Sequence, residues 1–174
     1  MAARTRPPPI RLAARRTGRL HDPVQNASAA AVDDSHTMLL GGLTSADTST
    51  DAVRVVSPQS DSGAGTLPTA VHDSAAAALA GSVYLFGVGT GSTQLDDIVR
   101  FGRASTSLTV GHLPSPSSDH AAATINGTVY VVDGYTGTDC LDTIVAYRPG
   151  VARMSWLISP LLSATQRSQQ PPAI

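Results

Sequence analysis

The chain has 174 residues, a net charge of −1 and one cysteine, Cys140. A single cysteine excludes an intrachain disulfide and a thiolate metal cluster, so stability has to come from burial and strand pairing. Residues 1–20 hold six arginines and no acid, which leaves the rest of the chain strongly acidic and a poor match for nucleic acid.

The first segment, residues 1–19, is a basic arm that contains Pro7-Pro8-Pro9 and little to bury. This composition predicts disorder, with contact to an anionic partner as the alternative. Arg11, Arg15 and Arg16 interrupt every apolar stretch that a signal peptide would need, and no window approaches the roughly 18 apolar residues of a membrane span. We therefore expect a cytoplasmic location by default and no contact with membrane.

From Leu20 onward the chain repeats at an interval of about 46 residues. Leu67-Pro68 recurs as Leu113-Pro114, and Val83-Tyr84 recurs as Val129-Tyr130. The first copy is more diverged, with Asp51, Val53 and Arg54 aligned to Asp97, Val99 and Arg100. Such self-similarity predicts a repeat architecture with units at 20–66, 67–112 and 113–158, followed at 159–174 by a degenerate fourth start or a disordered tail.

Each unit is predicted to contain four short strands. An Ala-rich strand ends at Leu79 or Ile125 and is followed by a two-residue turn, Ala80-Gly81 or Asn126-Gly127. Glycine-rich loops are expected after the second strands, and small side chains suit strands that converge on an axis. The later strands are predicted at Val83–Phe86, Ile98–Phe101 and Ser107–Val110, and at Val129–Val132, Ile144–Tyr147 and Val151–Met154.

The order of these features resembles the Kelch repeat of bacterial Kelch-repeat proteins, from about Leu20 to Met154. The paired glycine of that repeat is intact as Gly41-Gly42 and has become Gly87-Val88 and Asp133-Gly134. The resemblance implies an all-β fold, namely a partial, open Kelch-type β-propeller of about three four-stranded blades. A closed Kelch ring usually takes more blades, so we expect a fragment of a larger propeller or a protomer that self-associates to complete one.

Polar residues recur just before the Ala-rich strands, as Gln25-Asn26, His72-Asp73 and Ser118-Asp119. The resemblance implies that these loops and those between the second and third strands open on one face, where they could line a ligand site. The alternative is that the side chains cap loops by bonding to nearby backbone. The candidates for this ligand face are Asn26, His72, Asp73, Asp119, His120, Thr90 and Thr136.

The sequence shows no catalytic set. His72 and Asp73 are adjacent, and neighbours on an extended chain point to opposite sides, so a His–Asp pair would have to form between units. The five histidines show no metal-ligand spacing, and no nucleophile-elbow pattern is visible. We expect no catalytic residue, no metal and no cofactor.

The sequence therefore favours a non-catalytic Kelch-repeat binding or scaffolding module that takes a protein or carbohydrate ligand on its loop face. Two alternatives stay open. One is a carbohydrate-processing enzyme of the Kelch propeller type, oxidase-like or sugar epimerase-like. The other is a truncated fragment without a function of its own.

Overall fold

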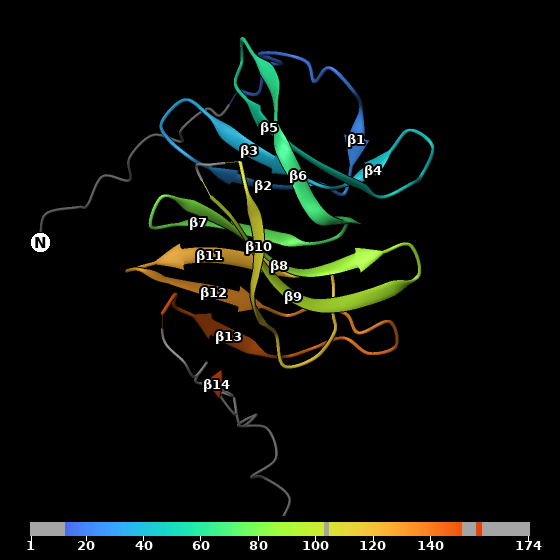
Figure 1. The fold of residues 1–174 in the computed structure, drawn as a ribbon, viewed down its shortest axis with the longest axis vertical. Helices are drawn as coiled ribbons and strands as arrows, with labels where there is room; N and C mark the ends of the chain where they lie inside the picture. The colour runs from blue at the N-terminus through green and yellow to red at the C-terminus, as the bar shows by residue number, and fades with distance from the viewer. Residues whose placement is uncertain (1–12, 103–104, 151–155, 158–174) are drawn as a thin grey trace, which may run out of the picture.

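The computed structural model describes residues 13–102 and 105–150 and the backbone of 156–157. Within these ranges the chain forms strands, turns and loops and no helix, which confirms the all-β class. Three four-stranded antiparallel sheets follow one another along the molecule, with a two-stranded sheet beside the first (Figure 1). A helix long and apolar enough to cross a membrane is absent from the described residues.

In each large sheet every strand pairs with the next large-sheet strand along the chain. The first sheet contains β2 (Ser28–Ala31), β3 (Thr37–Leu40), β5 (Thr50–Val56) and β6 (Asp61–Val71). The second contains β7 (Ala75–Leu79), β8 (Ser82–Thr90), β9 (Thr93–Phe101) and β10 (Ser107–His112). The third contains β11 (Ala121–Ile125), β12 (Thr128–Val132), β13 (Ile144–Tyr147) and β14 (Trp156–Leu157), and the small sheet pairs β1 (Val24–Gln25) with β4 (Leu43–Thr44).

The two predicted hairpin turns are present. Ala80 and Gly81 join β7 to β8, and Asn126 and Gly127 join β11 to β12, each as the two unpaired residues of a hairpin. All four have positive φ, between 49° and 75°. Two consecutive positive φ values give the turn whose twist matches the flanking strands, so the local sequence specifies these hairpins.

The glycine-rich loop expected after Phe86 is instead a continuation of strand β8. Gly87 forms a bulge between Phe86 and Val88, and the strand runs on to Thr90. Gly87 has a φ of 53°, and the residues that align with it, Gly41 and Asp133, have 62° and 58°. Because Asp tolerates the left-handed region better than most residues, the same backbone shape persists in the third unit without glycine.

Two predictions for the first unit need correction, namely its end and the alignment of its third strand. The boundary at 66/67 falls inside β6, which continues to Val71. In the first sheet Leu40 pairs with Val53, whereas in the second Phe86 pairs with Ile98, so the register puts Val53 in the place of Ile98 and Arg54 in the place of Val99. The connection between the second and third strands of the first sheet is therefore one residue longer than that of the second sheet, with the extra residue between Leu40 and Val53.

The second sheet is buried on both faces. One face carries Leu85, Val99 and Phe101 into a cluster with Leu40 and Val53 of the first sheet. The other face carries Tyr84, Phe86 and Ile98 into a cluster with apolar residues of the third sheet, Val129, Val131, Val145 and Tyr147. A sheet covered on both sides explains why β8 is a continuous apolar run rather than an alternating one.

The three Ala-rich strands lie side by side. Strand β7 packs against β2 on one side and β11 on the other. The Ser28 hydroxyl bonds to the carbonyl of Ser74, and the Thr124 hydroxyl donates to the carbonyl of Ala78 at 2.7 Å. Small side chains permit this close approach of the three inner strands.

Parts of three sequence predictions lie outside the described residues. These are the strand at Val151–Met154, the tail at 159–174 and the first 12 residues of the basic arm. Residues 13–19 of the arm are described, have no regular secondary structure and are exposed.

Candidate functional site

Three of the residues proposed for the ligand face form a row across the sheets. Asp73 donates its backbone N–H to the carbonyl of Asn26 at 3.1 Å, and Asp119 donates to the carbonyl of Asp73 at 2.7 Å. All three have a positive φ, between 51° and 59°. Asn and Asp are the residues that accept this conformation most readily after glycine, so the recurrent Asn/Asp has a backbone role.

The residue before each member of the row pairs with a residue of the segment that follows position 41, 87 or 133 of its unit, which in the second unit is the extension of β8. These pairs are Gln25 with Leu43, His72 with Gly89, and Ser118 with Tyr135. The loops before the inner strands and those between the second and third strands therefore meet at one end of the molecule. We call this end the loop end.

The side chains of the row give the loop end an acidic character. Burial raises the pKa of Asp73, and the neighbouring Asp119 carboxylate raises it further, while His72 and a hydrogen bond from Asn26 act in the opposite direction. Asn26 and Asp119 are exposed, and Asp73 is partly buried between them. The row thus presents an amide and two carboxylates, which are strong acceptors.

His72 lies between a hydroxyl and a carboxylate. Its Nδ1 is 2.8 Å from the Ser49 hydroxyl, and its Nε2 is 3.5 Å from a carboxylate oxygen of Asp73. The expectation that neighbouring His72 and Asp73 point apart is wrong, because the positive φ of Asp73 turns the chain back. Ser49 belongs to the first unit, and no local sequence pattern links it to His72, so this contact could not be predicted.

His120 has a packing role in this structure. Its Nε2 is 2.9 Å from the Ser117 hydroxyl, and its Nδ1 is 2.7 Å from the carbonyl of Asp133. Burial lowers the pKa of His120, although hydrogen bonds and nearby carboxylates oppose this. The ring fills space that glycine leaves free, since a Cβ on Gly87 or on Gly134 would overlap it.

Thr90, the last residue of β8, and Thr136, in the loop between β12 and β13, bond locally. The Thr90 hydroxyl is 2.7 Å from that of Thr93 across the β8–β9 hairpin. The Thr136 hydroxyl accepts the backbone N–H of Asp139 at 3.1 Å. The structure therefore joins Asn26, Asp73 and Asp119 in one row, whereas these two threonines shape separate loops.

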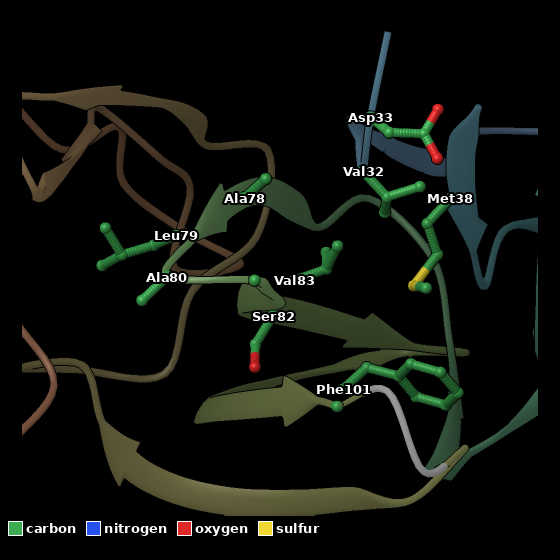
Figure 2. A pocket seen from close by; sticks show the side chains of 11 residues that line it. Val32, Asp33, Met38, Ala78, Leu79, Ala80, Ser82, Val83 and Phe101 are labelled. Carbon is green, nitrogen blue, oxygen red and sulfur yellow. The ribbon is translucent and has the colours of Figure 1, made fainter. Parts of the chain in front are cut away.

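A cavity of about 460 Å³ lies between the first and second sheets, away from the row. Figure 2 shows Val32 and Met38 entering it from the first sheet, and Val83 and Phe101 from the second. None of the sequence candidates lines it, because its walls are hairpin turns and apolar strand ends. The acid at its rim, Asp33, is held by the backbone N–H groups of Ser35 and His36, which lower its pKa.

Comparison with known proteins gives a likeness of fold. No family model matches the sequence, and no curated protein matches it. Among solved structures, that of YjhT matches with a TM-score of 0.68 and 15% sequence identity, over 78% of this chain and 46% of that one. The chain thus spans less than half the length of YjhT, and at this identity the likeness concerns the fold alone.

Proposed function

We propose that the three large sheets are blades of a partial Kelch-type β-propeller. Two contacts between successive units support this, because both join residues 46 positions apart, in or next to the inner strands: Ser28 with Ser74, and Ala78 with Thr124. The Ala-rich inner strands lie together while later strands carry the larger side chains, which is the distribution that blades around an axis require.

On this scaffold we propose a non-catalytic binding or scaffolding function, with the ligand at the loop end. The observation that carries the proposal is the row of Asn26, Asp73 and Asp119, which places equivalent acceptor groups from three units side by side. Two of the three are exposed. Such a surface suits a ligand rich in hydrogen-bond donors, as the hydroxyls of a carbohydrate or the N–H and ammonium groups of a peptide are.

Screening the full chain on a glycan array and a displayed peptide library tests this function. A ligand found there should bind Asn26→Gly plus Asp119→Asn at least about tenfold more weakly, since a hydrogen bond to a charged group contributes roughly 1.5–3 kcal/mol. Both replacements tolerate the positive φ of these positions. Asp142→Asn removes an exposed acid outside the row and serves as the matched control. Equal binding by the row variant and wild type would place the ligand elsewhere.

The same screen separates the alternatives of other classes. Turnover of a sugar in the glycan panel would favour the carbohydrate-processing enzyme over the binding module. A well-folded chain that binds nothing in either library would favour a fragment without a function of its own.

We also propose that the chain self-associates through the outer face of the third sheet. On that face Ile125, Val132 and Ile144 are exposed. The residues that align with Val132 and Ile144 in the second sheet, Phe86 and Ile98, are fully buried by the neighbouring sheet. A second copy of the chain is the occupant that we propose, because pairing two such faces about a two-fold axis buries both at once.

A further inference from the structure

Strand pairing between β9 and β10 brings together three groups that can bind a metal ion. A bulge between Thr109 and Gly111 shifts the register so that His112 lies directly across from Asp97. Asp96 precedes Asp97 on β9, and the three side chains each turn one donor atom toward the others. His112 follows Asp97 by 15 positions and Asp96 by 16, which is why sequence spacing gave no sign of the cluster.

The spacing of the donor atoms is that of ligands around one ion. Nδ1 of His112 is 3.1 Å from Oδ1 of Asp96 and 3.4 Å from Oδ1 of Asp97, and all three donor atoms lie within 4.8 Å of one another. A tetrahedral Zn²⁺ with bonds of about 2.0–2.1 Å holds neighbouring ligand atoms about 3.3 Å apart. The two measured histidine distances bracket that value.

We propose that Asp96, Asp97 and His112 form a binding site for a divalent transition-metal ion of the Zn²⁺ type. One imidazole nitrogen and two carboxylate oxygens supply three ligands, and water completes the tetrahedron. The imidazole selects Zn²⁺ over Mg²⁺ or Ca²⁺, which prefer oxygen ligands alone. Two carboxylates also offset the charge of the ion.

The cluster differs from the other histidine–carboxylate contacts of the chain. His36 meets only Asp33, with Nδ1 3.0 Å and 3.1 Å from its two oxygens. Among the described residues, the group around His112 is the one in which two carboxylates from separate residues converge on a histidine. A lone His–Asp contact is an ordinary surface pair, whereas three convergent donors can chelate an ion.

The site is open to an ion from solvent and has a structural consequence. The side chain of His112 is 61% exposed, and those of Asp96 and Asp97 are 38% and 29% exposed. Because the ligands come from two strands, a bound ion ties β10 to β9 near the point where the chain leaves the second sheet. This inference does not depend on the proposed ligand face.

Isothermal titration of the metal-free full chain with ZnCl₂ tests the proposal, with thermal unfolding as the second readout. We expect one equivalent of Zn²⁺ to bind and to raise the midpoint of unfolding, since an ion that binds only the folded state stabilises it. In His112→Ala and in Asp97→Asn, affinity should fall by at least about tenfold, because even outer partners of metal ligands are worth 10–100-fold. MgCl₂ should bind more weakly than ZnCl₂.

His36→Ala is the matched control, since it removes a similar exposed histidine that has a single acidic partner. It should bind Zn²⁺ as wild type does. The proposal is overturned if wild type takes up no Zn²⁺, if His112→Ala binds as tightly as wild type, or if His36→Ala loses the binding. The side chains of His112 and His36 are 61% and 41% exposed, and Asp97→Asn keeps the size of its side chain, so circular dichroism should show every variant folded.

Discussion

The outer face of the first sheet and the outer face of the third are built on the same repeat, yet they differ in polarity. Residues 15–24 lie along the first face, where Arg54 forms an ion pair with Asp61. The third face exposes Ile125, Val132 and Ile144 by 56%, 38% and 39%. The first and third sheets lie on opposite sides of the second (Figure 1).

The difference comes from few positions. By register Arg54 takes the place that Val99 has in the second sheet and Val145 in the third, and both valines are buried by a neighbouring sheet. A charged pair at that place makes a face that cannot accept another sheet. Repeat proteins need such polar outer faces at their ends for solubility. The first face therefore has the character of a cap, and the third has the character of a surface that packs against another sheet.

The packed interior between these two faces should be the part of the molecule where substitutions cost the most stability. A Cβ on Gly87 would lie 2.5 Å from the Ser117 carbonyl oxygen and 2.6 Å from the His120 ring. We expect Gly87→Ala to lower the free energy of unfolding by about 2–5 kcal/mol, the sum of left-handed strain and overpacking. Urea unfolding measures it.

Gly91→Ala is the control for this substitution. Its φ of 60° imposes similar backbone strain, but an added Cβ meets nothing within 4 Å. It should cost only about 1–2 kcal/mol. Equal costs for the two variants would mean that Gly87 does not lie in close contact with Ser117 and His120.

Breaking the cap should have the next largest effect. The side chain of Asp61 is only 8% exposed, and Arg54 is its charged partner. Arg54→Ala leaves that carboxylate nearly buried without its cation, so we expect a loss of roughly 3 kcal/mol in urea unfolding. Arg54→Val with Asp61→Ser copies the second sheet at the aligned positions and should recover most of the loss. If the single and double variants are equally stable, the ion pair does not hold this face.

We expect a smaller effect of pH on stability, and it should differ in sign between Asp61 on the first face and Asp73 at the loop end. Burial tends to raise the pKa of Asp61. The hydrogen bond from the backbone N–H of His21 and the guanidinium of Arg54 have a larger combined effect and lower the pKa below 3.8. Stability from Asp61 is therefore present above pH 3.8 and lost as pH falls through its folded pKa. Asp73 has a raised pKa, so its contribution has the opposite sign: it is most favourable below pH 3.8 and is lost as pH rises through the folded value.

Urea unfolding across the acid range separates the two carboxylates. Asp73→Asn should be more stable than wild type at neutral pH, and this advantage should shrink on acidification towards pH 3.8. Asp61→Asn should be less stable than wild type at neutral pH, with the deficit shrinking below pH 3.8. Parallel pH profiles for both variants would contradict the opposite shifts.

Local sequence was enough to predict some elements and not others. Asn126-Gly127 and the β13 strand at Ile144–Tyr147 follow from turn chemistry and apolar runs, and the structure has both. The extension of β8 through Gly87 was missed, because a glycine in a bulge and a glycine in a loop look alike in sequence.

The candidate site shows the same limit. The recurrent Asn26, Asp73 and Asp119 could be found from the repeat, yet their backbone row depends on how the sheets pack. Ser49 next to His72, and His112 across from Asp97, are contacts between distant segments, and the second of these pairs depends on a bulge. Such contacts cannot be predicted from the spacing of residues along the chain.

We expect the outer face of the third sheet to bind a second copy of the chain and that of the first sheet not to do so. The most direct test is the mass of the protein in solution, measured by light scattering over a range of concentrations. Wild type should approach twice the mass of one chain as concentration rises, and Val132→Asp plus Ile144→Asp should stay at the mass of one chain. Arg15→Asp, on the capped side, should behave as wild type does. A wild-type chain that stays single at every concentration, or a third-face variant that still pairs, would contradict the account.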